Sequence, residues 1–570
     1  MTQDGGRLHA LLPHVTPFGP EKIKHHRSVA PPSQNRPALG PSPTHSRRTV
    51  PVADMATVAH IAGVAPATKS GFRPASSRAD RRAPVARRAV AIARCAASND
   101  DADVDESVRT TRGSMNSSRR GILSAAASIA TTALSPLAGT AFDYPAPDVV
   151  TLQENFWAKA TREAHPERWY PYWWALPLAP YGSKATAMAE VVPGQVWTFD
   201  QLQGLLDVLV NVRMTVVAMA NGGLWVHNPV APTQELMDML APIVDTYGPV
   251  KHIVVGSAAI EHKIYSGPFS KKFPAADVWL PRQNWTFPVD VPIDTYVPYY
   301  PRGSPKYLPL DSTSGVGAVP WGDEIEHYTL EVGGSSLRNF KDPWFVDTAF
   351  YHKKSRTMLV TDVVLHVSQD PVPVATIEPE PLLVRGMDAP DRMLPNTAEA
   401  RSAGWGKTVL FGLLFNPAAV DVRIDPSKIN KSFLDGFYWE SKWKDAFRNL
   451  TDKDMFVPPI LHTLAFPRRR DEVKRWAECV AAWDFERIIP GHLDGPIDAT
   501  PKQFAAAIDV ALSKSSREVF GEDIDTLEQI DKISRDLKSL EEPRPLSDPS
   551  PVRYYTPPPP EPMEQPLPMD

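Results

Sequence analysis

The feature that most constrains the fold of this chain is a short β-branched run that ends in polar groups. Ile253-Val254-Val255 predicts a buried strand, and Gly256-Ser257 breaks it. Glu261 and His262 follow the break within a few residues. Folds of the α/β class bind ligands where a strand ends and polar side chains leave the sheet. The stretch therefore predicts a functional site directly after this strand.

Two later stretches repeat this design. The apolar run from Thr357 to Thr361 is followed by Asp362, and the run from Phe485 to Ile489 is followed by Pro490-Gly491-His492. Both runs have the short, apolar character of buried strands. We therefore predict that the three strand ends converge, so that His262, Asp362 and His492 meet in one site.

The order of the remaining elements indicates an α/β fold. Strand-like runs from Val208 to Met219 and from Gly223 to His227 are joined by Asn221-Gly222, which is a strong hairpin signal. Thr233 is placed to cap a helix, which Gly248-Pro249 ends. Further strands are predicted over 325–332 and 344–351, and further helices over 471–483 and 501–514. This order is the pattern of a layered α/β domain.

We assign residues 142–515 to the folded domain, with two insertions. One is a Pro- and aromatic-rich segment over 285–345, and the other covers 368–460. The apolar stretch from Val409 to Phe415 inside the second insertion is too short to cross a bilayer. Residues 516–570 form a polar, Pro-rich tail, which we expect to be disordered from Glu541 onward.

The residues that precede the domain have the composition of targeting sequences. An initiator-like Met55 suggests that residues 1–54 are an upstream extension of the gene model. Residues 55–98 are rich in Arg, Ala and Ser and hold a single acid, which is typical of a plastid or mitochondrial transit peptide. In residues 99–141 an acidic spacer, Arg119-Arg120 and an apolar run form a twin-arginine-type export signal.

The two signals in series predict a chloroplast protein of the thylakoid lumen, with no permanent membrane span after processing. For the apolar run, the alternatives are an uncleaved anchor and a chance Ala-rich helix.

The folded domain is acidic once the preceding residues are set aside. Residues 1–141 hold 19 of the 61 Lys and Arg and 9 of the 66 Asp and Glu, which leaves 42 bases and 57 acids. A domain of formal net charge −15 argues against nucleic acid as a partner, because phosphates would repel it.

Four phrases of the sequence are distinctive in combination: Leu224-Trp225-Val226-His227-Asn228-Pro229, Glu261-His262-Lys263, Phe273-Pro274-Ala275-Ala276 and Ile489-Pro490-Gly491-His492. Together they resemble an uncharacterised plant, algal and cyanobacterial domain-of-unknown-function family related to the metallo-β-lactamase superfamily. The resemblance covers about residues 190 to 515. It implies an αββα sandwich in which metal ligands meet where strand ends converge.

The resemblance also implies that one of the superfamily's two metal positions is lost. The motif His-x-His-x-Asp-His falls on residues 257–262, where Ser257 and Ala259 stand in place of two imidazoles. At the other position the resemblance implies His262, Asp362 and His492 as ligands. At most one ion is therefore expected.

Glu261 stands where the motif has Asp, and we expect it to act as a further ligand or as a catalytic base. Imidazole and carboxylate groups suit Zn²⁺ with an open coordination position, or Fe²⁺ or Mn²⁺. The chain has only two cysteines, which excludes a thiolate cage. A positive charge on Lys263 would oppose the ion if this side chain pointed inward.

Two functions are compatible with these residues. The first is a mononuclear metal-dependent hydrolase that acts on an ester, thioester or lactone of an unknown small molecule. The second is a catalytically silent relative that serves as a binding or assembly module for a thylakoid protein. In the second case His262 is an ordinary hydrogen-bonded residue, Asp362 caps a turn and His492 shapes one. His227 is expected to pack rather than to join the site.

Overall fold

The structure is a computed structural model that describes residues 163–170, 178–179, 183–205, 208–281, 301, 303, 305–312, 319–333, 343–389, 394–422, 437–536 and 540–557. The expected gene-model extension (1–54), transit peptide (55–98) and export signal (99–141) lie outside these residues. Among the residues described, no helix combines the length and apolar character needed to cross a bilayer.

The first sheet is built from the earlier part of the described chain. Its eight described strands are β1 (Leu178–Ala179), β2 (Thr186–Val192), β3 (Val196–Leu205), β4 (Val208–Ala218), β5 (Leu224–His227), β6 (Val250–Val254), β7 (Asp277–Leu280) and β8 (Lys306–Tyr307). They follow the order β1-β3-β4-β5-β6-β7-β8, and β2 pairs with β3. The strands from β5 to β8 are parallel, so β5 and β6 end at the same edge.

The second sheet has the described order β15-β14-β11-β10-β9. Its strands are β9 (Ile325–Gly333), β10 (Pro343–His352), β11 (Thr357–Leu359), β14 (Arg487–Ile489) and β15 (Ile497–Asp498). Strands β11 and β14 are parallel, with Leu359 opposite Ile489. The chain therefore leaves both strands at one edge, and Asp362 and His492 follow there. A separate two-stranded ribbon joins β12 (Val420–Val422) to β13 (Phe437–Trp439).

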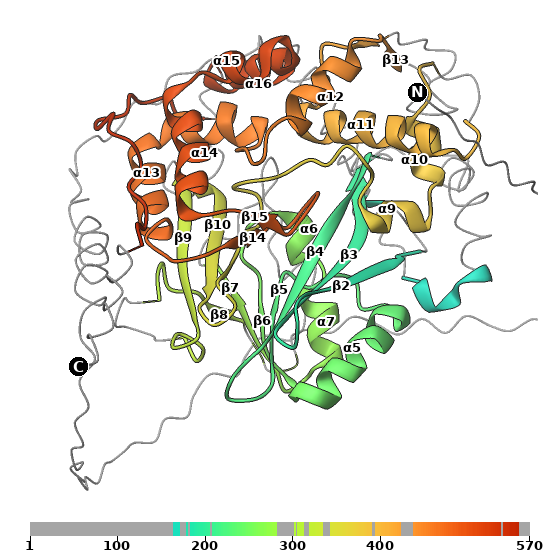
Figure 1. The fold of residues 1–570 in the computed structure, drawn as a ribbon, viewed down its shortest axis with the longest axis vertical. Helices are drawn as coiled ribbons and strands as arrows, with labels where there is room; N and C mark the ends of the chain where they lie inside the picture. The colour runs from blue at the N-terminus through green and yellow to red at the C-terminus, as the bar shows by residue number, and fades with distance from the viewer. Residues whose placement is uncertain are drawn as a thin grey trace, which may run out of the picture. The chain divides into compact units, whose positions relative to one another are not determined.

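The described helices lie outside the two sheets, apart from short segments at the site (Figure 1). They are α5 (Gln234–Tyr247), α6 (Ile260–Lys263), α7 (Ser266–Lys272), α9 (Pro373–Ile377), α10 (Glu380–Arg385), α11 (Ala398–Leu414), α12 (Trp443–Thr451), α13 (Arg470–Val480), α14 (Pro501–Ser513), α15 (Ser516–Phe520) and α16 (Asp525–Asp536). Short turns of other helix types cover Pro166–Arg168, Leu461–Ala465, Phe466–Arg468 and Gly521–Ile524.

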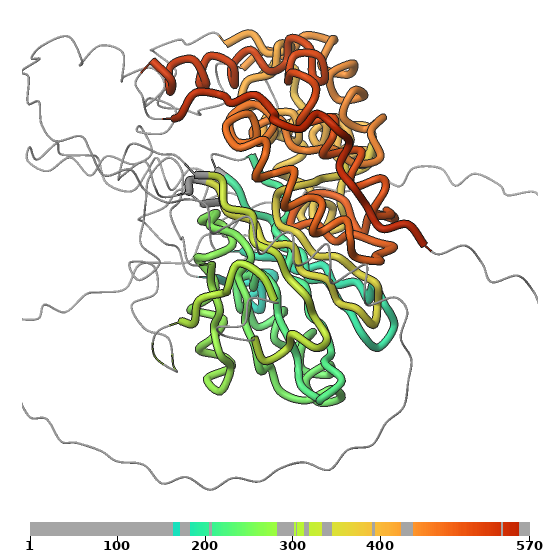
Figure 2. Tube along the Cα trace, turned by 90° about the vertical axis from the view of Figure 1, so that its left-hand side faces the viewer, coloured from blue at the N-terminus to red at the C-terminus, as the bar shows by residue number. Residues whose placement is uncertain are grey.

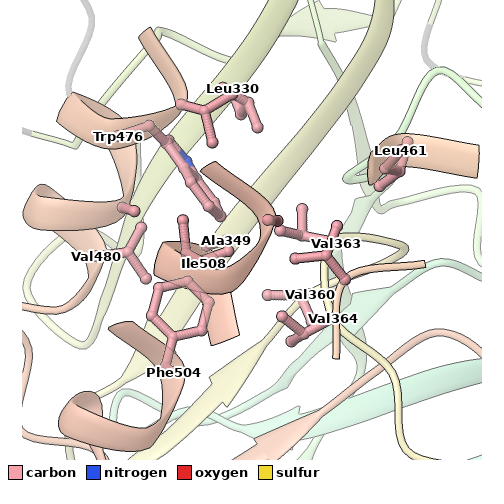
Figure 3. Close-up of a cluster of buried hydrophobic side chains, with 14 of the residues drawn as sticks. Leu330, Ala349, Val360, Val363, Val364, Leu461, Trp476, Val480, Phe504 and Ile508 are labelled. Atoms are coloured by element: carbon pink, nitrogen blue, oxygen red, sulfur yellow. The ribbon is translucent and has the colours of Figure 1, made fainter. Parts of the chain in front are cut away.

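Three apolar layers show that the fold is an αββα sandwich, as predicted. Leu236 and Leu240 of α5 pack on the outer face of the first sheet. Between the sheets, Val254 of β6 lies in one cluster with Phe350 of β10. On the outer face of the second sheet, α13 and α14 cover β9, β10 and the segment after β11 (Figure 3). The labelled residues of this outer layer are Leu330, Ala349, Val360, Val363, Val364, Leu461, Trp476, Val480, Phe504 and Ile508.

Local sequence signals explain the elements before the site. Strands β4 and β5 form the predicted antiparallel hairpin, in which Gly222 and Gly223 both adopt positive φ at the turn. The hydroxyl of Thr233 accepts from Leu236 N and caps α5, as predicted. Gly248 ends the helix at φ 97°. The hairpin, the helix and the following strand could therefore be located from the sequence.

The strand predicted over 325–332, inside the expected insertion 285–345, is confirmed as β9, which pairs along its length with β10. The expected insertion 368–460 is largely helical, and Trp405, Val409 and Leu410 of α11 pack against the end of the first sheet. The apolar stretch from Val409 to Leu414 is therefore the last part of helix α11, and Phe415 follows the helix.

The tail is ordered for longer than predicted. Helices α15 and α16 follow the expected end of the domain at residue 515. Residues 540–557, here called the C-terminal strap, then run along the helical layer, in red in Figure 2. The prediction of disorder from Glu541 is therefore wrong up to residue 557. The strap has no helical or strand period in its sequence. It is held by hydrogen bonds to residues distant in the chain, among them Pro467 and Ala481.

Candidate metal centre

The structure brings together the side chains that follow the three predicted strand ends. His262 Nε2 lies 2.9 Å from His492 Nε2, and His492 Nε2 lies 3.2 Å from Asp362 Oδ1. A carboxylate oxygen of Glu261 lies within 4.8 Å of the ligand nitrogens of both histidines. Two atoms bound to one tetrahedral zinc ion are about 3.3 Å apart, given Zn–N distances near 2.0–2.1 Å. Among the described residues, Glu261, His262 and His492 form a group that could hold one ion, and Asp362 reaches this group through its contact with His492.

His262 reaches the site from a short helix that the sequence did not reveal. Helix α6 begins after Ala259, and the N–H groups of His262 and Lys263 both donate to Ala259 O. His262 is 1% exposed. Lys263 follows it at about 100° around the helix axis, and its side chain is also buried. The two side chains therefore leave the helix in different directions.

Asp362 is held by a second buried carboxylate. Asp347 of β10 accepts N–H groups from Thr361, Asp362 and Val363, at 3.1, 2.7 and 2.9 Å. Ser257 Oγ lies 3.5 Å from the other oxygen of Asp362. Burial and the nearby Asp362 charge raise the pKa of Asp347 to about 8, while the three N–H donors act in the opposite direction. Asp347 thus fixes the backbone that carries Asp362.

Glycines allow the segments of the site to approach closely. A Cβ on Gly256 would lie 2.6 Å from His227 Nε2, and one on Gly491 would lie 3.0 Å from Thr361 O. His227 itself packs against Trp225 and Phe350, and burial lowers its pKa to about 3. Among the described residues, nothing hydrogen-bonds its Nε2. His227 therefore lies behind the site and packs there, as expected.

The charged groups of the site shift one another's pKa values. Burial disfavours a charged His492, but the hydrogen bond and charge of Asp362 raise its pKa to about 9. Burial would raise the pKa of Asp362, yet the hydrogen bond and charge of His492 lower it. Burial and the positive His492 lower the pKa of His262 to about 3. Burial and the Asp362 charge raise the pKa of Glu261. Without an ion, the site holds an imidazolium against a carboxylate.

The two non-ligand positions of the motif have structural roles. Ala259 is the N-cap residue of α6, and its N–H donates to Ser257 Oγ at 3.0 Å. Ser257 also pairs with Asp347 in an isolated β-bridge. Sequence reasoning missed Asp347 as well as Asn211, whose carbonyl oxygen contacts His492 Nδ1. Neither residue follows a strand end, which was the signal used to find the others.

The fold and site define a two-sheet α/β protein with a candidate metal centre. The family model described as "Domain of unknown function (DUF4336)" matches residues 193–510, and the chain belongs to this family. No curated protein matches the chain. That the family occurs in plants, algae and cyanobacteria stays a prediction.

Several solved structures are similar to the chain at low identity. DIM-1 metallo-β-lactamase exposed to ceftazidime is 10% identical over 57% of this chain and 97% of its own, with a TM-score of 0.27. A metallo-β-lactamase from Pontibacter korlensis is 10% identical over 57% of this chain and 99% of its own, with a TM-score of 0.26. The metal-soaked Flv1 flavodiiron core from Synechocystis is 7% identical over 58% and 61%, with a TM-score of 0.29.

Proposed function

We propose that the chain is a degenerate metallo-β-lactamase-like protein that holds one divalent metal ion and hydrolyses an ester, thioester or lactone. His262, Asp362 and His492 are the proposed ligands, with Glu261 as a further ligand or as the base. The observation that carries the proposal is the meeting of two imidazole nitrogens and a carboxylate oxygen within 2.9 and 3.2 Å at a buried sheet edge.

The residues fit such an ion chemically. His492 Nδ1 lies 2.8 Å from the carbonyl oxygen of Asn211, so this nitrogen carries the proton and donates it. Its Nε2 then points a lone pair at the site whenever the ring is neutral. An ion would take the place of the proton that the His492 and Asp362 pair holds without it. Nitrogen and oxygen donors of this kind suit Zn²⁺, Fe²⁺ or Mn²⁺.

The side chains around the ion can handle substrate and protons. A bound divalent ion would supply Lewis acidity toward water and toward a carbonyl oxygen. Burial and the Asp362 charge raise the pKa of Glu261, which makes its carboxylate a stronger base toward a proton of bound water. The Asp362 side chain keeps 22% of its exposure, whereas His262 is almost fully buried. Substrate would therefore approach from the carboxylate side.

The alternative is a catalytically silent binding or assembly module at the thylakoid. It is favoured by the roles of Ser257 and Ala259, which support α6 and Asp362 where a second ion would need imidazoles. The location in the chloroplast, and there in the thylakoid lumen, is proposed from residues 55–141 alone. Fractionation that found the protein in the cytosol or stroma would remove this part of the proposal.

Metal content of the purified chain tests the main proposal. We expect about one ion per chain by elemental analysis after dialysis, and none in His262→Ala. His165→Ala changes an exposed histidine outside the site and should keep the ion. If the unaltered chain holds no metal at any added Zn²⁺, Fe²⁺ or Mn²⁺ concentration, only the binding module remains.

Glu261→Gln separates the two roles proposed for this residue. As a base, Glu261 can be replaced without loss of metal, and only the hydrolysis of ester, thioester and lactone test substrates should fall, by about 10²- to 10⁴-fold. As a ligand, its replacement should weaken metal binding as well. Unchanged metal content together with unchanged hydrolysis would exclude both roles.

A further inference from the structure

We propose that three buried side chains of the first sheet, Asp200, Asn211 and Arg213, are positioning residues for the candidate metal centre. They fix the loop after β14 and thereby the direction of His492 Nε2. The inference rests on the metal site proposed above and deepens it, because it assigns the preorganisation of one ligand to residues that follow no strand end. We call these three residues the polar triad.

The polar triad is a closed network between β3 and β4. Arg213 Nε donates to Asp200 Oδ1 at 2.8 Å, and its Nη2 donates to Oδ2 at 2.7 Å. Asn211 Nδ2 donates to the same Oδ2 at 2.9 Å. Asp200 and Arg213 face each other directly across the two strands. Because a bidentate arginine and carboxylate pair has a fixed geometry, the guanidinium cannot turn away from the loop.

The triad donates its remaining hydrogen bonds to the loop. Arg213 Nη1 donates to Pro490 O at 3.1 Å, and its Nη2 donates to Leu493 O at 2.9 Å. The backbone N–H of Arg213 donates to Gly491 O at 2.8 Å. Asn211 Nδ2 donates to Leu493 O at 3.0 Å and its Oδ1 accepts Leu493 N–H at 2.8 Å. The residues before and after His492 are thus held by side-chain and backbone groups of β4, almost three hundred positions earlier in the chain.

This support maintains a strained backbone. Leu493 has φ 56°, in the left-handed region that bulky residues rarely adopt. Both its N–H and its C=O are bound by the triad, so the surrounding structure over-determines the conformation. Backbone strain of this kind persists only when neighbouring groups enforce it. The unusual conformation of Leu493 changes the direction of the residue next to it in the chain. Here that residue is His492.

The same strand sets the tautomer of the ligand. His492 Nδ1–H donates to the backbone carbonyl of Asn211 at 2.8 Å. The ring can then offer only Nε2 to Asp362 and His262. A hydrogen bond to the second ring nitrogen is the usual means by which proteins orient a metal-binding histidine. The triad therefore acts on both the position of the loop and the orientation of the ring.

Stability alone does not account for burying these charges. Asp200 is 7% exposed and Arg213 is 4% exposed. Removing two charges from water is costly, and well-packed apolar side chains in their place are often as stabilising. What an apolar pair cannot supply is the set of donors that bind Pro490 O and Leu493 O.

The test measures zinc affinity of the full chain by competition with a chelator, and coordination geometry by visible absorption of bound Co²⁺. Asp200→Asn keeps the shape of the side chain but removes the charge that holds Arg213. We expect zinc affinity to fall by about 10- to 100-fold and the Co²⁺ spectrum to change. Arg213→Lys keeps the positive charge but loses the two parallel hydrogen bonds of the guanidinium. It should give the same result, and it replaces Asp200→Asn if that variant does not fold.

The matched control is Asp531→Asn. It removes the carboxylate partner of Arg468, which is a buried arginine in the helical layer away from the site. We expect comparable loss in the midpoint of urea unfolding and unchanged zinc affinity. Zinc affinity that is unchanged in both folded triad variants would overturn the inference. An equal loss in Asp531→Asn would overturn it as well, because the effect would then follow stability alone.

A second readout works without metal. Nitrogen-15 shifts of the His492 ring report which ring nitrogen carries a proton and how it is bonded. If the parent chain binds no zinc, the proposed function fails, and these shifts decide the inference by themselves. Shifts altered in Asp200→Asn but not in Asp531→Asn support the positioning role. Identical shifts in the parent chain and Asp200→Asn contradict it.

Discussion

At the scale of single residues, Lys184 is a buried lysine outside the metal centre whose amino group has acceptors on a neighbouring strand. It is 3% exposed, and its Nζ donates to Leu202 O at 2.9 Å and to Gln203 Oε1 at 3.2 Å. Gln203 Nε2 donates in turn to Glu261 O at 3.3 Å. Lys184 is therefore linked through one side chain to the helix that carries His262.

Lys184 should make stability depend on pH. Burial lowers the pKa of Lys184 from 10.5 to about 7. Between these values the unfolded chain binds a proton that the folded chain does not, so the free energy of unfolding should rise with pH. The contribution of Lys184 should approach about 1.4 kcal/mol per pH unit between pH 8 and 10. Urea unfolding of the parent and of Lys184→Met measures it as the difference between two slopes. Parallel slopes would show that Lys184 stays charged in the folded chain.

The positions of the candidate site residues could be located from the sequence at this scale, whereas the residues that support them could not. His262, Asp362 and His492 each follow an apolar run, and that position marks a site in an α/β fold. Asn211 and Arg213 alternate with apolar residues within β4, which is the pattern of a strand with one solvated face. In a two-sheet sandwich both faces of such a strand are covered. The local sequence pattern cannot show which distant loop will cover the polar face of β4.

At the scale of elements, strong local signals located the strands and helices around the site. The hairpin, the capped α5 and the amphipathic α13 could be predicted because their turn residues, capping residues and hydrophobic periodicity all lie within a short stretch of sequence. The C-terminal strap has no such local signal. Val552 is 1% exposed, and its N–H donates to Asp509 at 2.9 Å. Such long-range contacts order a Pro-rich segment without leaving a period in its sequence.

Lys474 of α13 should control whether the strap stays in place. Its Nζ donates to Asp548 O, Ser550 O and Ser550 Oγ, at 2.8, 2.6 and 2.9 Å. Losing hydrogen bonds from a charged donor costs about 1.5 kcal/mol or more, so Lys474→Met should release the strap at least about tenfold more often. Limited trypsin digestion followed by mass spectrometry measures this as faster cleavage after Arg553. Lys532→Met, which removes an exposed lysine, is the control. Equal cleavage in both variants would show that other contacts hold the strap.

At the scale of the whole molecule, the candidate centre depends on both sheets. His262 follows the first sheet, while Asp362 and His492 follow two parallel strands of the second. The layer between the sheets, which includes Val254 and Phe350, keeps these edges in register. The αββα architecture could be predicted from the resemblance, but the donor distances depend on packing across the whole domain. Spacing in the sequence carries no such information.

Because the ligands exist together only in the folded chain, an ion that binds them should stabilise it as a whole. Free Zn²⁺ at 100 times its dissociation constant should raise the free energy of unfolding by about 2.7 kcal/mol. Urea unfolding at increasing Zn²⁺ concentration measures this increase, and excess chelator should reverse it. The same titration of His492→Gln should be flat. A parent chain whose unfolding ignores Zn²⁺ would contradict a single high-affinity site.

The late position of His492 in the chain has a consequence for biosynthesis. A ribosome makes both strands of the β4–β5 hairpin and the whole of α6 long before it adds the second imidazole. Until then Asn211 and Arg213 have no loop to bind. Of the two histidines, His262 and His492, a nascent chain can present only His262. An ion that needs both imidazoles would therefore bind only after translation of the domain is almost complete. Any truncated product that ends before this loop lacks the centre altogether.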